Sequence, residues 1–124
     1  MSTPDVELRL PAQSPFVAVI RMMTAGLAAR VDFTIDDIED LRMAVGEACA
    51  LVLDVATEDA SLFVRCDLGE GQMGLAVSVD AAEGHGVDME SFAWQVLSAL
   101  VEDLQESSGP DGTTVTFTVT STKG

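Results

Sequence analysis

The spacing of apolar residues predicts a helix over residues 14 to about 30. Ser14 and Pro15 suit the N-cap and first position of a helix, because a serine hydroxyl accepts backbone N–H groups and proline needs no N–H there. Apolar side chains then recur at intervals of four, three and four residues, which places them on one face. These side chains are Phe16, Ile20, Met23 and Leu27. We expect this helix to end near Arg30.

A second, longer helix is predicted over residues 35–56. Thr34 and Asp37 match a capping box, with aspartate in place of the usual glutamate. The acidic residues of the first turn also suit the positive end of the helix dipole. A continuous apolar stripe follows, made of Ile38, Leu41, Val45, Ala48, Val52 and Val55.

Alternation of apolar and polar residues predicts four strands. The first covers residues 6–10 and is ended by Pro11. Residues 62–66 and 73–79 form two more, joined by a glycine-containing turn typical of a hairpin. The last covers residues 113–120, where threonines alternate with valine and phenylalanine.

A third helix is predicted over residues 89–105, between a glycine-containing loop at 81–88 and a polar turn at 107–112. The order of elements is then strand, helix, helix, strand, strand, helix, strand. Because strands and helices come partly in blocks, we expect an α+β two-layer sandwich. Its sheet would be mixed or mostly antiparallel, with three helices on one face. The length fits a single domain over residues 1–124.

The charge balance narrows the classes of partner. Six Lys and Arg against 21 Asp and Glu give a formal net charge of −15. Nucleic acids and anionic membrane surfaces attract basic patches, so binding to either is not expected. A basic protein partner is favoured by the strong negative field, unless the charge only keeps the protein soluble. The chain shows no apolar run of about 20 residues and no secretory signal, so we expect a cytoplasmic protein.

Two places carry candidate chemistry on general grounds. Glu47 lies at the border of the long helix's apolar stripe, where partial desolvation suits a general base, although a glutamate there also reaches solvent easily. Residues 83–86 (EGHG) contain Gly84 and Gly86, which let backbone N–H groups approach a phosphate or a base, or simply form a loop.

Two further features are less specific. Residues 110–115 form a turn that enters a threonine-rich strand, and their hydroxyl groups can bond a ligand or only begin the strand. Trp94 belongs to the core or fills a space that a ligand takes in other proteins. Cys49 and Cys66 do not have metal-site spacing, so we expect no metal centre and two buried thiols.

Together these segments resemble the anti-sigma factor serine kinases, the RsbW/SpoIIAB type of the GHKL (histidine-kinase-like) ATPase superfamily. The likeness spans about residues 6–122 and implies the GHKL, or Bergerat-type, fold. Residues 37–48 (DIEDLRMAVGEA) resemble the helix that carries the family's base glutamate. Residues 112–115 (GTTV) resemble its closing box, and residues 91–100 (SFAWQVLSAL) resemble the actinobacterial branch.

The resemblance implies a site for ATP and magnesium. The matching positions are Glu47 as the catalytic base, and Gly84, Gly86, Gly112 and Thr114 as cofactor-binding residues. Asp80 is one candidate for the aspartate that binds adenine. An alternative register places residues 83–86 on the family's glycine pattern and leaves Ala82 at the aspartate position.

Three features depart from the active members of this family. Their magnesium-binding asparagine, four residues after the base, is Leu51 here, which offers no oxygen ligand. The glycines that open their next helix are Ser91 and Ala93, whose β-carbons block close approach of phosphates. Only four residues separate Gly86 from Ser91, a span of at most about 14 Å, too short for a flap over a triphosphate. These losses predict a weak or inactive kinase.

The resemblance also implies partners. Family members form dimers that hold a stress- or sporulation-type sigma factor away from RNA polymerase, until a STAS-type anti-anti-sigma factor releases it. Arg21 matches a first-helix arginine that the family uses toward partners, or is an ordinary exposed arginine. The leading hypothesis is therefore an anti-sigma factor that acts by sequestration. The alternative is an ATP-dependent serine kinase that phosphorylates the anti-anti-sigma factor.

Overall fold

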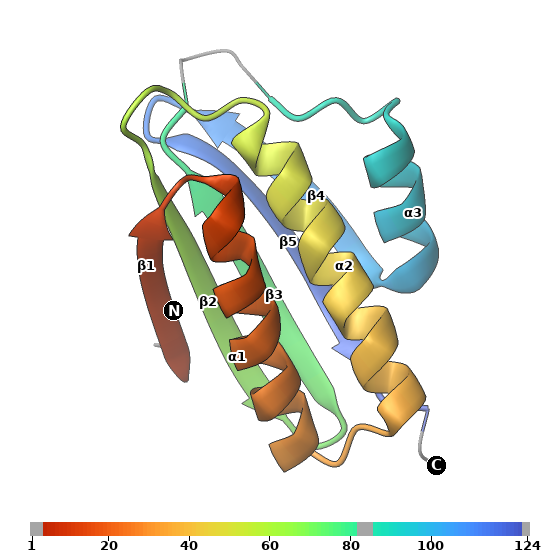
Figure 1. Cartoon of the computed structure of the whole chain (residues 1–124). Helices are drawn as coiled ribbons and strands as arrows, with labels where there is room; N and C mark the ends of the chain where they lie inside the picture. The colour runs from red at the N-terminus through yellow and green to blue at the C-terminus, as the bar shows by residue number, and fades with distance from the viewer. Residues whose placement is uncertain (1–3, 82–85, 123–124) are drawn as a thin grey trace.

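A five-stranded antiparallel sheet forms one layer of the molecule, and three helices form the other (Figure 1). The computed structural model describes residues 4–81 and 86–122. The strands are β1 (Val6–Pro11), β2 (Ser61–Gly69), β3 (Gln72–Val79), β4 (Glu102–Gly109) and β5 (Gly112–Thr120), in the spatial order β1-β2-β3-β5-β4. The helices are α1 (Val17–Arg30), α2 (Ile35–Leu53) and α3 (Phe92–Leu100). The predicted α+β two-layer sandwich is confirmed.

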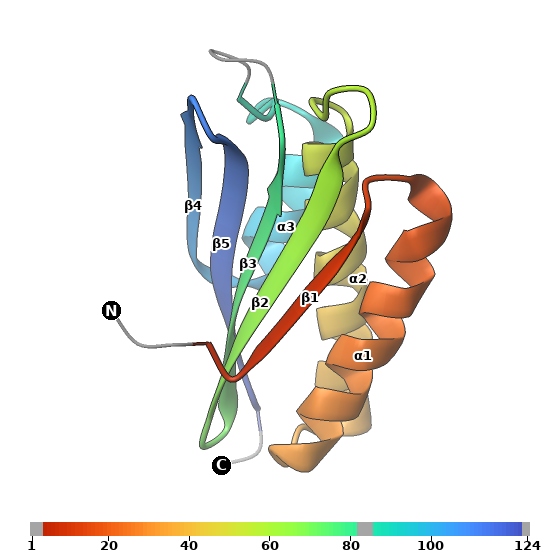
Figure 2. The ribbon, with the colours of Figure 1, turned by 90° about the vertical axis from the view of Figure 1, so that its left-hand side faces the viewer.

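All three helices lie on the same face of the sheet, and no helix within residues 4–81 and 86–122 covers the other face, called the uncovered face below (Figure 2). Strand side chains alternate accordingly, so that every second residue of β2, β3 and β5 is buried under the helices. The largest fully buried side chains of the sheet are Leu62, Met73, Val64, Val77, Val79 and Val115. α2 supplies most of the buried helical residues. Among the described helices, none has the length and hydropathy of a membrane span.

The predicted capping box of α2 is confirmed. The Thr34 hydroxyl accepts a hydrogen bond from Asp37 N at 3.1 Å, and the Asp37 carboxylate accepts one from Thr34 N at 3.1 Å. The same carboxylate holds the end of the chain, because it also accepts hydrogen bonds from Ser121 Oγ, Thr122 N and Thr122 Oγ1. α2 ends at Leu53, three residues before the predicted boundary.

The start of α1 differs from the prediction. Residues Ser14–Phe16 form a short 3-10 turn (η1), and no side chain caps either this turn or α1. Ser14 therefore does not act as the expected N-cap, while Pro15 does lie in the first turn. The helix ends at Arg30 as predicted. Its buried residues are Ile20, Thr24 and Ala28.

The predicted third helix is too long at both ends. α3 begins at Phe92, capped by the Ser91 hydroxyl, and ends at Leu100. Residues 102–109 form the edge strand β4, which pairs with β5 through a tight hairpin. Leu100 and Leu104 are four residues apart, a spacing that imitates a helix, but pairing with β5 satisfies this segment's backbone instead. The sheet therefore has five strands where four were predicted.

Both cysteines are free and buried, as expected. Burial raises the pKa of the Cys49 thiol to about 12, against the opposing charge of Arg21. Burial also raises the pKa of the Cys66 thiol, to about 11, and the nearby Asp67 carboxylate adds to this. Both side chains are therefore protonated, unreactive core groups at neutral pH.

Candidate functional site

The face of α2 that turns toward α3 carries the predicted base. Glu47 is half-buried there, and Leu51 and Asp54 follow four and seven residues later, a spacing that keeps all three on one side of the helix. α3 lies beside this part of α2 (Figure 1). Leu51 is 5% exposed, so the position of the family's metal ligand is here part of the core.

A cavity of about 180 Å³ lies between α2 and α3. Its lining residues are Ala50, Leu51, Asp54, Asp88, Ser91 and Ala93. None of these six is cationic, and two are carboxylates. Trp94, one position beyond, is half-buried and packs against the core, whereas Phe92 is 78% exposed. Trp94 thus packs with the core, which was one of the two interpretations of this residue from the sequence.

The one glycine of the EGHG segment that the structure describes, Gly86, faces a carboxylate of the protein itself. Glu106 on β4 accepts hydrogen bonds from Val87 N at 3.1 Å and from Ser108 Oγ at 2.8 Å. A β-carbon on Gly86 would collide with this Glu106 carboxylate. The space that the missing β-carbon of Gly86 leaves is therefore occupied by the Glu106 side chain of β4. Gly84 and Ala82 lie outside the described residues.

Three other predicted residues gather at one end of the uncovered sheet face. Asp80, Gly112 and Thr114 all line a hollow of about 370 Å³, together with Phe63 and Ser107. The Thr114 and Ser78 hydroxyl groups share a hydrogen bond of 2.8 Å across β5 and β3. The predicted nucleotide residues are therefore divided between two faces of the sheet, with Glu47 on the helical side.

Asp80 and Gly112 both have structural roles at this end. The Asp80 carboxylate accepts a hydrogen bond from Ser61 N at 3.0 Å, and its backbone carbonyl accepts one from Thr57 N. Gly112 has φ of +129°, and a β-carbon there would collide with the carbonyl oxygen of Val79. These contacts tie the ends of β2, β3 and β5 together.

Sequence reasoning selected Thr114, but its neighbour Thr113 is the threonine that faces the helices. Thr113 is 1% exposed and shares its side of β5 with Val115 and Phe117. The alternation of this strand was readable in the sequence and would have assigned Thr113 to the helical side. The residues that reasoning missed entirely are Asp54, Asp88 and Glu106.

The described residues do not fit ATP with magnesium. Ligand pockets for molecules of this size measure about 300–1,000 Å³, well above the 180 Å³ between α2 and α3. The cavity lining includes two acidic residues and no cation, whereas a triphosphate needs cations or N–H groups, and Leu51 offers no oxygen ligand for magnesium.

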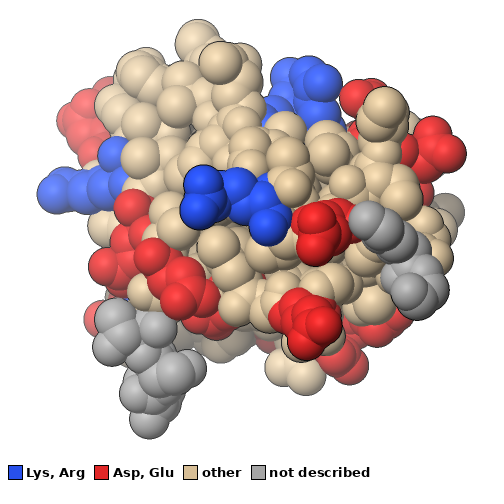
Figure 3. Space-filling view, turned by 90° about the horizontal axis from the view of Figure 1, so that it is seen from below, with Lys and Arg blue, Asp and Glu red and all other residues tan. Residues whose placement is uncertain are grey.

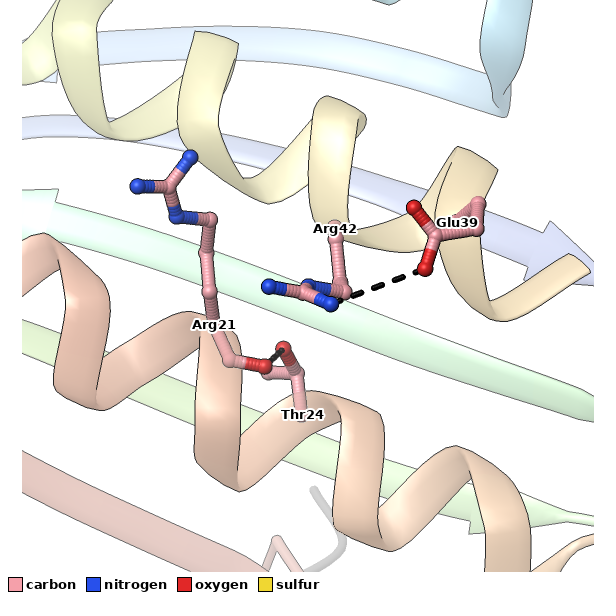
Figure 4. A network of polar contacts seen from close by, with 4 residues as sticks. All are labelled: Arg21, Thr24, Glu39 and Arg42. Atoms are coloured by element: carbon pink, nitrogen blue, oxygen red, sulfur yellow. Dashed lines mark hydrogen bonds and ion pairs between the residues drawn. The ribbon is translucent and has the colours of Figure 1, made fainter. Parts of the chain in front are cut away.

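Arg21 extends from α1 toward α2 (Figure 4). Its guanidinium lies over Gly46, where a β-carbon would be 3.5 Å from Arg21 Nη1. The nearby Arg42 pairs with Glu39 at 3.5 Å, whereas Arg21 has no ion pair within residues 4–81 and 86–122. α1 contains no acidic residue, and its exposed side includes Val19 and Met22.

The arginines do not form a basic stripe at the end of the molecule seen in Figure 3. Separate basic groups alternate there with acidic ones around a broad uncharged area. Arg65 on the uncovered sheet face is likewise paired, with Glu7 at 3.5 Å.

Comparison with known proteins identifies the family. A model of the histidine kinase-like ATPase domain matches residues 10–119, so the chain belongs to this family. Two curated relatives are serine-protein kinases RsbW, one from Halalkalibacterium halodurans and one from Bacillus thuringiensis. The first is 39% identical over 88 residues, which cover 70% of this chain and 52% of the relative. The second is 41% identical over 54 residues, which cover 44% of this chain and 34% of the relative.

The chain thus matches about half of one relative's length and about a third of the other's. A solved structure of the RsbU and RsbW domains of Rv1364c from Mycobacterium tuberculosis has the same fold. It aligns with a TM-score of 0.65 at 19% identity, over 94% of this chain and 32% of that one. The resemblance to the RsbW type and the expected GHKL fold are confirmed.

Proposed function

We propose that the protein is an anti-sigma factor that sequesters an alternative sigma factor without transferring phosphate. The observation that carries this proposal is the small acidic cavity between α2 and α3, where Leu51 stands at the position of a metal ligand. Binding a partner needs surface complementarity only, so it survives the loss of a nucleotide site. The proposed setting is the cytoplasm, and the proposed antagonist is a STAS-type anti-anti-sigma factor.

Charge supports a basic partner. The net charge is −15, and sigma factors present basic surfaces wherever they approach DNA. Like other members of its family, the chain would act as a homodimer. Electrostatic attraction of this kind raises the association rate and weakens as salt screens it.

Copurification with candidate sigma and STAS proteins, with and without ATP and magnesium, tests the proposal. We expect a sigma complex that forms equally well without nucleotide and whose affinity falls as NaCl is raised from 50 to 500 mM. A complex that requires ATP would contradict sequestration by a nucleotide-free domain. An affinity unchanged over this salt range would remove the electrostatic part alone.

The kinase alternative has one observation in its favour, since Glu47 is half-buried on α2, four residues before Leu51 of the cavity lining. We nevertheless expect ATP with magnesium to leave the melting temperature unchanged. A ligand at ten times its Kd would stabilise the fold by about 1.4 kcal/mol, a shift of several degrees. Labelled phosphate appearing on a STAS protein, and lost in Glu47→Ala, would establish the kinase instead.

Arg21 is proposed to contact the partner. We expect Arg21→Ala to change the free energy of unfolding by less than about 0.5 kcal/mol, because the guanidinium is exposed and unpaired in the described structure. The same variant should weaken sigma or STAS binding at least fivefold in a titration. Arg30→Ala, at the exposed end of the same helix, is the matched control. Equal affinities for the two variants would show that Arg21 has no special part in binding.

A further inference from the structure

The cavity between α2 and α3 has the dimensions of one side chain. Its volume of about 180 Å³ is close to that of a cavity of about 150 Å³ that accepts a benzene-sized molecule. Ala50, Leu51 and Ala93 give it apolar walls. Asp54 and Asp88, both exposed, are the two acidic residues of its lining. A lining that combines apolar and acidic residues suits a side chain with an apolar stem and a positively charged end.

The charges around the cavity indicate which charge the entering side chain would carry. Asp54 is the C-cap of α2, where the helix dipole is negative and the last turn has no basic residue to offset it. Its carboxylate accepts no hydrogen bond from any residue that the structure describes. The positive end of α3 opposes this field, but the Ser91 hydroxyl already caps it, and Asp88 and Glu90 lie beside it. The site therefore favours a cation.

Apolar groups are exposed next to the same cavity. Phe92 and Met89 flank the lining residue Ser91 and are 78% and 56% exposed. Exposed side chains of this size beside a hollow are typical of protein contact sites, where aromatic and methionine residues are enriched. The uncovered sheet face offers larger hollows, but its cations and carboxylates are partly paired with each other.

We propose that this cavity receives a lysine or arginine side chain of a partner protein, with Asp54 as its charge partner and Phe92 and Met89 packing against apolar neighbours of that side chain. The side of the domain where α2 and α3 meet would then bind a basic, amphipathic segment of a protein in place of an anionic nucleotide. This inference deepens the proposed function, because it names the chemistry by which a basic partner is recognised.

The first test needs no natural partner. N-acetyl-arginine amide is titrated into the full chain, with the neutral N-acetyl-citrulline amide as the comparison ligand, and backbone amide NMR shifts are recorded. We expect saturable shifts for the arginine ligand at the cavity, covering residues 50–54 and 88–94, and at least fivefold weaker binding of citrulline. Asp54→Asn should abolish the preference for arginine, whereas Glu58→Gln, an equal change of charge on an exposed loop, should keep it.

Three outcomes of this titration overturn the inference. They are no shifts at the cavity, equal affinities for the two ligands, and shifts that ATP with magnesium reproduces at the same residues. Because the ligands are small molecules, each outcome is independent of whether the chain binds a sigma factor.

The second test uses a sigma factor that copurifies with the chain. We expect Asp54→Asn to weaken the complex about tenfold and Phe92→Ser at least fivefold, with Glu58→Gln changing it less than twofold. Unchanged affinity in both cavity variants would overturn the inference while leaving sequestration in place. If no sigma factor binds the wild-type chain, the proposed function fails and the NMR titration alone decides the inference.

Discussion

We expect Gly112→Ala to lower the free energy of unfolding by about 3 kcal/mol or more, and the melting temperature by roughly 10 °C. Gly112 has φ of +129°, which L-residues avoid, and a β-carbon there would collide with the carbonyl oxygen of Val79. The backbone of β3 cannot retreat without breaking its hydrogen bonds to β2 and β5. Thermal and urea unfolding, followed by circular dichroism, measure the loss.

Gly109→Ala is the matched control for this variant. Gly109 pairs with Gly112 across the same hairpin, but an added β-carbon at position 109 meets nothing within 4 Å. The control should stay within about 0.5 kcal/mol of the wild type. Equal stability of the two variants would mean that the fold does not depend on a glycine at position 112.

The second large effect is expected from Asp37→Ala, which should cost about 2–3 kcal/mol. The Asp37 side chain is 4% exposed and holds two separate parts of the chain. It completes the capping box with Thr34 and accepts hydrogen bonds from Ser121 and Thr122. Its removal leaves these donors unsatisfied and frees the end of the chain from α2.

Asp36→Ala is the control for this substitution. Asp36 is exposed in the same first turn of α2 and contributes only its charge to the helix dipole, so about 0.5 kcal/mol is expected. Hydrogen exchange adds a local measurement, since the amides of residues 117–122 should lose protection in Asp37→Ala alone. Equal losses of unfolding free energy in the two variants would mean that Asp37 contributes only through its charge at the helix N-terminus.

The same contacts make stability depend on pH. Burial acts to raise the pKa of Asp37, but the hydrogen bonds from Thr34 and Thr122 outweigh it and hold the pKa well below its usual value of 3.8. A carboxylate whose pKa is lower in the folded state stabilises the fold above its unfolded pKa. This contribution is complete above about pH 5 and is lost as the pH falls below 4. The wild type should therefore lose more stability between pH 5 and 2.5 than Asp37→Ala does.

The candidate site was only partly predictable. The sequence pattern placed Glu47 correctly on the core border of a helix, since a single helix fixes its own faces. The separation of Glu47 from Asp80 and Thr114 depends on which side of the sheet each residue faces. Asp54, Asp88 and Glu106 carry no motif, and they gain meaning only where α2, α3 and β4 meet.

Local interactions explain what the sequence alone determined. The capping box, the strand alternation and the β2–β3 hairpin arise from residues within a few positions of one another, so their patterns are readable directly. β4 was not predicted because residues 102–109 have few strand-forming side chains. Their extended backbone is stabilised by pairing with β5, and most of the paired residues are seven or more positions apart in the sequence.

Tertiary packing decided the rest. The tie between Asp37 and Thr122 joins residues 85 positions apart, and the Glu106 contact with Val87 spans 19. The size of the cavity between α2 and α3 and the charge of its lining also result from packing. They depend on how closely the two helices approach and on which acidic residues that approach brings together. The sequence thus determined a domain of the histidine kinase-like family, and the packing of α3 against α2 determined which residues line the cavity between them.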